Sequence, residues 1–154
     1  GIFLGGFLSD YFGRRNVTLI PRVVALALLF GLPFGAAIYI ASDSALVFML
    51  IGVPAAAGGA YLGPSIAMVQ SLVAVRMRTV ASALLLFIIN FVGMGIGSAV
   101  IGAMSDALTP TFQHDALRYT LLIVMTFNLW AAFHYWRAGA FMADGLKRAQ
   151  EASS

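Results

Sequence analysis

Four long stretches of the chain carry no charged side chain, and short polar segments separate them. The stretches cover residues 23–41, 44–75, 79–105 and 119–136. A membrane-spanning helix needs about 20 predominantly apolar residues, with a range of roughly 17–25. Membrane strands would alternate apolar and polar positions, whereas these runs are unbroken. The pattern therefore predicts four membrane-spanning helices.

The connections between the stretches are short. Residues 42–44 and 76–79 are minimal turns, and the longest connection, 106–118, contains Thr109-Pro110-Thr111, which predicts a break in the helix. Residues 1–8 are apolar but too few to span a bilayer, so they predict the end of a helix that begins further upstream. After Arg137 the chain turns polar, and its alanine-rich composition permits a short cytosolic helix.

Successive connections along the chain are alternately rich and poor in lysine and arginine. They are absent from the turn at 42–44, and a single arginine flanks the fourth stretch. The others lie at the first turn, the third turn and the tail: Arg14, Arg15, Arg22, Arg76, Arg78, Arg137, Lys147 and Arg148. Because lysine and arginine are retained on the cytoplasmic side, this order predicts that both ends of the four-helix part are cytoplasmic.

Composition supports a membrane protein and excludes several other classes. The 154 residues are 61% hydrophobic and 10% charged, whereas a soluble domain carries about 25% charged residues. The net charge of +3 is small and does not suggest nucleic acid. There are no cysteines, and neither a nucleophile–base constellation, an H-E-x-x-H nor a P-loop is visible. The sequence predicts no enzyme, no metal and no cofactor.

The densest cluster of glycine and opposite charges lies at residues 6–15, which suits a short loop between two membrane helices. Gly6 is expected to let one helix end approach its neighbour, and Gly13 to adopt the positive φ of a tight reversal. Asp10 is expected to pair with an arginine or to meet the positive end of a helix dipole.

This cluster resembles the cytoplasmic signature loop of the major facilitator superfamily, G-x-L-[AS]-D-x-x-G-R-[RK]. The matching residues are Gly6, Leu8, Ser9, Asp10, Gly13, Arg14 and Arg15. The resemblance continues downstream and is most similar to the carboxy-terminal half of the bacterial spinster-like branch, on residues 63–64, 70, 76–83, 90–97, 102 and 105–106. An ordinary short loop with positive-inside charges would need no such fixed spacing.

The resemblance implies a fold class and a division of the chain. Family members have twelve helices, so the chain is expected to be all-α and integral to the membrane, with four helices and the end of a fifth. Residues 1–8 would end a truncated helix eight, 9–16 form the cytoplasmic signature loop, 17–140 form helices nine to twelve, and 141–154 form a cytosolic tail. Placement on helices two to six has the same topology, but the polar tail and the arginine-rich third turn favour the carboxy-terminal placement.

Candidate functional residues follow from the same resemblance. The loop residues Gly6, Asp10, Gly13, Arg14 and Arg15 are implied to stabilise cytoplasmic helix ends in one state, with Arg78 as a further partner for Asp10. Helices ten and eleven border the central cavity of the family, which makes Tyr61, Gln70 and Asn90 candidate cavity-lining residues. Glycines at helical spacing, Gly59, Gly63, Gly93 and Gly97, predict close helix packing or a substrate path.

Two functions remain open. One is part of a secondary active transporter of the bacterial inner membrane, which moves a small organic or amphipathic solute by alternating access. Its partners would be the lipid bilayer and the missing amino-terminal half. The alternative is a four-helix membrane scaffold or assembly subunit that transports nothing. No charged residue lies in the middle of a stretch, so a titrating residue for proton coupling is expected elsewhere.

Overall fold

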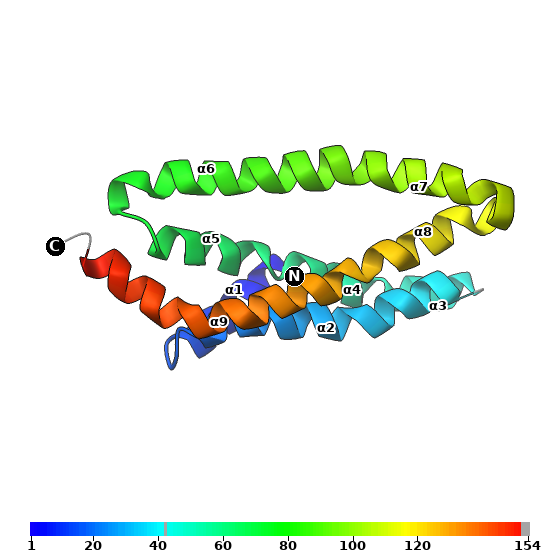
Figure 1. The fold of residues 1–154 in the computed structure, drawn as a ribbon. Helices are drawn as coiled ribbons and strands as arrows, with labels where there is room; N and C mark the ends of the chain where they lie inside the picture. The colour runs from blue at the N-terminus through cyan, green and yellow to red at the C-terminus, as the bar shows by residue number, and fades with distance from the viewer. Residues whose placement is uncertain (42, 152–154) are drawn as a thin grey trace.

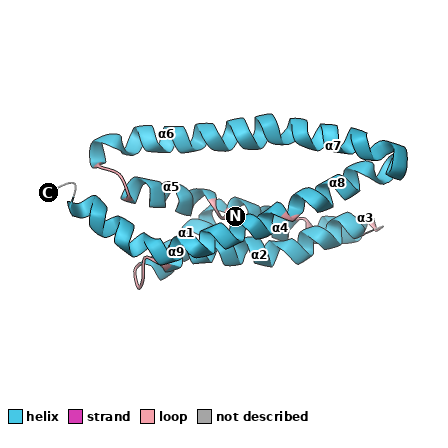
Figure 2. Cartoon of the chain, viewed as in Figure 1, coloured by secondary structure: helices cyan, strands magenta, loops and turns pink. Residues whose placement is uncertain are grey.

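The computed structural model describes residues 1–41 and 43–151, and every element in them is helical. Residue 42 of the second predicted turn and residues 152–154 of the predicted tail lie outside the described residues. Figures 1 and 2 show the chain running back and forth along one direction. The elements are α1 (Ile2–Gly13), α2 (Leu19–Ile40), α3 (Ser44–Leu50), α4 (Gly52–Gly59), α5 (Leu62–Ser71), η1 (Val75–Met77), α6 (Arg78–Ile88), η2 (Ile89–Ile96), α7 (Gly97–Phe112), η3 (Gln113–Asp115), α8 (Ala116–Met125) and α9 (Phe127–Glu151).

Helix α2 is the centre of the packing, because it contacts α1, α4, α8 and α9. The buried apolar side chains are few and mostly small, and they include Val24 and Ala25 of α2 and Ala132 of α9. Small side chains let helix backbones approach closely, which is the main source of helix association in lipid. The core of the described chain is therefore a seam between helices rather than a cluster of large side chains.

The segment α6–η2–α7 lies apart from this seam. It contacts α5 at one end and α8 at the other, and Figure 1 shows it arching over the remaining helices. None of its residues is buried, and large side chains such as Phe87, Phe91 and Met94 are exposed. An apolar face of this extent needs lipid or another protein surface beside it.

Three stretches of the described residues are long and apolar enough to cross a membrane: Leu19–Ile40, Ser44–Ser71 and Val75–Ala149. The third stretch reverses direction at Gln113, whose φ is 48° (Figure 1). Helices α7 and α8 then contact each other on either side of the reversal. The all-helical, apolar character agrees with the expected fold class, and the count of four spans stays a prediction.

The predicted helix break at Thr109-Pro110-Thr111 is wrong. Helix α7 continues through Pro110 to Phe112. Proline removes one backbone donor and disfavours the helix interior, but Pro110 lies in the last turn of α7, where little helix follows it. The hydroxyl of Thr109 also donates to the carbonyl oxygen of Ser105, at 2.8 Å. The connection therefore shrinks to η3.

Candidate functional site: the first turn and the polar contacts between helices

The signature residues are more helical than the sequence predicts. Helix α1 extends to Gly13, so residues 9–13 of the predicted loop 9–16 are helical and the chain reverses over residues 14–18. The backbone N–H of Arg14 donates to the carbonyl of Asp10, and the N–H of Thr18 donates to Oδ1 of Asn16 at 3.0 Å. The turn is thus held by main-chain bonds and one asparagine side chain.

Gly13 does not adopt the predicted positive φ, because no glycine in the described residues has one. The reversal uses ordinary right-handed backbone angles, with φ −61° at Arg14. Gly13 instead provides space, since a Cβ there would lie 2.8 Å from Cγ1 of Ile20. The absence of a side chain lets the start of α2 pack against the end of α1.

The close approach expected of Gly6 occurs at Gly5. A Cβ at Gly6 would meet no atom within 4 Å, whereas a Cβ at Gly5 would overlap the backbone of Ala60. Gly59 and Gly63 face the same helix, with their Cβ positions 3.4 Å from the nitrogen of Ile2 and 3.7 Å from Cα of Gly6. Helix α1 therefore rests on the backbone of α4 and α5.

Asp10 is exposed in the last turn of α1. The carboxyl end of a helix carries the negative end of its dipole, so α1 itself disfavours this carboxylate and does not offer the positive end that was expected. Among the described residues Asp10 forms no ion pair with Arg14, Arg15 or Arg78. The guanidinium of Arg15 lies over the ring of Tyr11, 5.4 Å from the ring centroid. Asp10 is left facing outward at this end of the helices.

The three candidate cavity residues lie in different surroundings, and no hydrogen bond joins them within the described chain. Nε2 of Gln70 donates to Oγ of Ser82 at 2.9 Å, which ties α5 to α6. Nδ2 of Asn90 donates to the carbonyl oxygen of Leu86 at 2.8 Å, within its own helical segment, and Asn90 is exposed. Tyr61 is half-buried at the interruption between α4 and α5.

Gly93 lies in η2, an eight-residue π-helix that the sequence does not predict. A Cβ at Gly93 would meet no atom within 4 Å, and a Cβ at Gly97 would meet only the carbonyl oxygen of Val92 at 3.3 Å. The hydroxyl of Ser98 donates to the carbonyl oxygens of Met94 and Gly95 at the end of this segment. No described helix packs on these two glycines, so their packing role stays a prediction. π-Helical segments occur frequently at functional sites.

Two contacts between distant residues were not visible in the sequence. Oγ of Ser65 and the hydroxyl of Tyr135 lie 2.7 Å apart and join α5 to α9. The guanidinium of Arg22 lies 5.2 Å from the ring centroid of Trp136, beside Gly139. A cationic side chain over an aromatic ring is attracted by the ring's quadrupole. Residues separated by 70 or more positions carry no local signal of such pairing.

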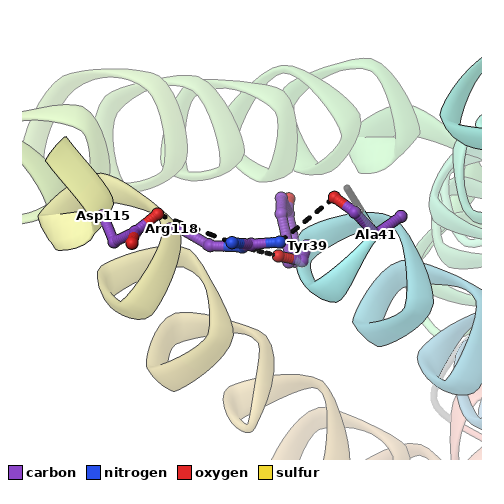
Figure 3. A network of polar contacts seen from close by, with 4 residues as sticks. All are labelled: Tyr39, Ala41, Asp115 and Arg118. Carbon is purple, nitrogen blue, oxygen red and sulfur yellow. Dashed lines mark hydrogen bonds and ion pairs between the residues drawn. The ribbon is translucent and has the colours of Figure 1, made fainter. Parts of the chain in front are cut away.

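A third contact lies at the opposite end of α2 (Figure 3). Arg118 donates from Nε to the carbonyl oxygen of Tyr39 and from Nη2 to the carbonyl oxygen of Ala41, at 3.1 Å. Its Nη1 also lies 3.5 Å from Oδ1 of Asp115. These carbonyls lie at the carboxyl end of α2, and the negative end of the helix dipole there favours a cation. The sequence marks Arg118 only as a residue flanking the fourth stretch.

Among the described residues no group of three or more histidine, cysteine, aspartate or glutamate side chains is placed to hold a metal ion. No family model matches the chain, and no solved structure matches it. The chain is 35% identical over 141 residues to a protein of Mycolicibacterium smegmatis (strain ATCC 700084 / mc(2)155) named "MFS-type efflux pump". The match covers 91% of this chain and 33% of that relative, so the chain spans about one third of the relative's length.

Proposed function

We propose that this chain is part of a secondary active transporter of the major facilitator superfamily. The observation that carries the proposal is the 35% identity, over 91% of the chain, to a protein named an MFS-type efflux pump. Long apolar helices and the signature residues at the end of α1 and in the turn after it agree with it. The similarity supports superfamily membership and a role in transport across a membrane rather than in catalysis.

Within this proposal the chain supplies helices eight to twelve of a twelve-helix protein of the spinster-like branch. Both ends of the four-span part then face the cytoplasm of a bacterial cell. The exposed faces of α6, η2 and α7 support such a placement, because they leave large apolar side chains to be covered by lipid or by the remaining two thirds of the transporter. The substrate is a small organic or amphipathic solute, which crosses by alternating access and, by analogy with the relative's name, outward.

The proposed gating residues gather at one end of the molecule. The turn at 14–18 and the start of α6, which carries Arg78, both lie at the end where the chain terminates (Figure 1). Asp10 is exposed there. An exposed carboxylate at the negative end of its own helix gains free energy from a cation or a helix amino terminus supplied by another element. Asp10 therefore stabilises one conformational state when such an element docks. Gly6, where a Cβ would meet no atom, leaves room for this element, and Gly13 lets the start of α2 pack against α1.

The proposal is tested with the complete protein in bacteria, with efflux of the fluorescent dye ethidium as the readout. Cells that express it are expected to accumulate less dye when energised, and Asp10→Asn is expected to reduce efflux at least several-fold at equal abundance. Asp106→Asn is the matched control. Asp106 is also exposed and follows Gly102 at the spacing of Asp10 after Gly6, but no pair of arginines comes after it. Abundant protein without energised efflux of ethidium or of other amphipathic dyes would favour the scaffold function instead.

A further inference from the structure

A cavity of about 390 Å³ lies between α2, α4 and the junction of α8 with α9. Small-molecule sites measure about 300–1,000 Å³ and are lined mainly by apolar side chains with a few polar groups. No charged residue lines this cavity, and its walls include Gly31, Gly35, Tyr39, Gly58, Met125 and Asn128. It is separate from the first turn and from Tyr61, Gln70 and Asn90.

The helices around the cavity approach one another closely on two of its sides. A Cβ at Gly31 would lie 2.7 Å from Cβ of Ala57, and a Cβ at Gly35 would lie 2.9 Å from Sδ of Met125. At Gly58, by contrast, a Cβ would meet no atom within 4 Å. Because the contacts at Gly31 and Gly35 are already tight, the walls cannot move closer together without a steric clash. A guest in an apolar space of this size gains dispersion contacts with the walls.

Two walls of the cavity are interrupted helices, and the third, α2, is a continuous helix that contains a proline. α2 carries Pro33 between Gly31 and Gly35. The second stretch is interrupted at Ile51, just before Pro54, and the last stretch is interrupted at Thr126. There the N–H of Thr126 donates to Ile123 and that of Leu129 to Thr126, each at 3.0 Å and three residues back rather than four. Interrupted membrane helices commonly mark ligand sites in transporters.

Asn128 is the polar side chain that this irregular turn presents to the cavity. Its amide has no hydrogen-bond partner among the described residues. An amide in apolar surroundings carries a free-energy cost when it lacks a hydrogen-bond partner, and the half-buried position of Asn128 reduces this cost without removing it. A guest with one carbonyl or hydroxyl group would recover part of this cost, while the apolar walls would accept its remaining surface.

The end of the cavity beside Tyr39 is fixed in place. Tyr39 lines the cavity, and its carbonyl oxygen accepts the hydrogen bond from Nε of Arg118. Arg118 thereby ties the end of α2 to α8, the helix that supplies Met125. The cavity is thus bounded by helices whose spacing a polar contact maintains, as a preformed site requires.

We propose that this cavity binds a small, uncharged, largely apolar molecule with one carbonyl or hydroxyl group, which hydrogen-bonds to Asn128. The absence of charge in the walls excludes organic cations and phosphate headgroups. The proposal concerns binding and does not depend on transport, so it can fail while the proposed function holds.

The probe is benzophenone, an uncharged diaryl ketone that inserts into nearby C–H bonds when illuminated. The complete protein in lipid nanodiscs is illuminated with benzophenone, digested and analysed by mass spectrometry. Adducts are expected in the lining, foremost at Met125, and to saturate with probe concentration. Gly58→Leu, which fills the open space, is expected to reduce these adducts at least tenfold, and Asn128→Leu about threefold or more.

Gly52→Leu is the matched control, because Gly52 is also on α4 with no atom within 4 Å of a Cβ, yet lies outside the cavity lining. It is expected to leave adducts in the lining unchanged. Size-exclusion profiles and thermal unfolding confirm that each variant folds. An absence of adducts in the lining overturns the proposal, and this is also the result expected if lipid acyl chains fill the cavity. Adducts that persist in both Gly58→Leu and Asn128→Leu overturn it as well.

Discussion

The hydroxyl groups of Ser65 and Tyr135 lie 2.7 Å apart and form a hydrogen bond between α5 and α9. Oγ of Ser65 also donates to the carbonyl oxygen of Tyr61 at 2.6 Å, which makes the Tyr135 hydroxyl the donor to Ser65. A single serine therefore connects the start of one helix to the middle of another. This pair sits among otherwise apolar surfaces and gives the contact between the two helices a defined register.

Tyr135→Phe is expected to lower the free energy of unfolding by about 0.6 kcal/mol, and by no more than roughly 1.7 kcal/mol, the range for hydrogen bonds between membrane helices. Ser65→Ala is expected to have a similar effect. The double variant is expected to cost less than the sum of the two, because both single changes remove the same bond. Denaturant unfolding in detergent micelles measures all three, and strict additivity would contradict a direct bond.

Replacement of Arg118 by methionine is expected to destabilise the described fold by about 1–2 kcal/mol. A hydrogen bond to a charged group contributes roughly 1.5–3 kcal/mol, and the side chain's 35% exposure reduces this. Lysine is expected to restore only part of the loss, since it lacks the fork that reaches two carbonyls. Asp115→Asn is the control and is expected to change stability by about 0–1 kcal/mol, as for exposed ion pairs. Equal effects of the two substitutions would mean that the ion pair, rather than the carbonyl bonds, carries the contact.

Gly5 and Gly6 are expected to respond oppositely to alanine. Gly5→Ala places a methyl group on the backbone of Ala60, and overpacking costs typically 1–3 kcal/mol. Gly6→Ala meets no atom and gains helix propensity, so stability is expected to stay unchanged or rise by up to about 1 kcal/mol. Thermal unfolding of the two variants decides the matter, and loss of stability at Gly6 alone would contradict the packing of α1.

The alternation of basic residues predicts opposite membrane sides for alternate turns. Cysteines that replace Arg14 and Arg76 are expected to react with a membrane-impermeant thiol reagent from the cytoplasmic side only. Cysteines at Asp43 and Thr111 are expected to react from the outside only. These 154 residues contain no native cysteine, so within them only the introduced cysteine reacts. Labelling of positions 43 and 76 from the same side would rule out the four-span topology.

The helical runs follow from the sequence because the length of a charge-free stretch and the polar residues that flank it are local properties, whereas the turns at 9–16, 76–79 and 106–118 are shorter than predicted. The turn at Asp43 follows from such local properties: its Oδ1 accepts the N–H of Ala45 at 2.9 Å and caps α3, as expected of an aspartate between two apolar runs. The interruptions at Ile51 and Thr126 were not predicted. They depend on how neighbouring helices pack, and the apolar pattern on either side is uninterrupted.

The candidate site was less accessible to prediction. The signature residues identify the first turn, yet they do not reveal that Gly5 rather than Gly6 touches Ala60, since adjacent helical positions differ only in the direction they face. The resemblance implies cavity-lining roles for residues of helices ten and eleven only, which selects Asn90 and leaves out Asn128. In the structure Asn128 lines a cavity, while Asn90 bonds its own helix. Which polar side chain faces a neighbour is decided by helix rotation, and a single sequence does not encode that rotation locally.

The three residues Arg118, Tyr39 and Ala41 differ in how strongly their contact restricts the amino acid at each position. Arg118 contributes its side chain, whereas Tyr39 and Ala41 contribute only their main-chain carbonyls. Almost any amino acid at positions 39 and 41 can supply the same acceptors, whereas position 118 needs a guanidinium. The cost of losing the guanidinium therefore falls on position 118, and a change of side chain at position 39 or 41 cannot offset it.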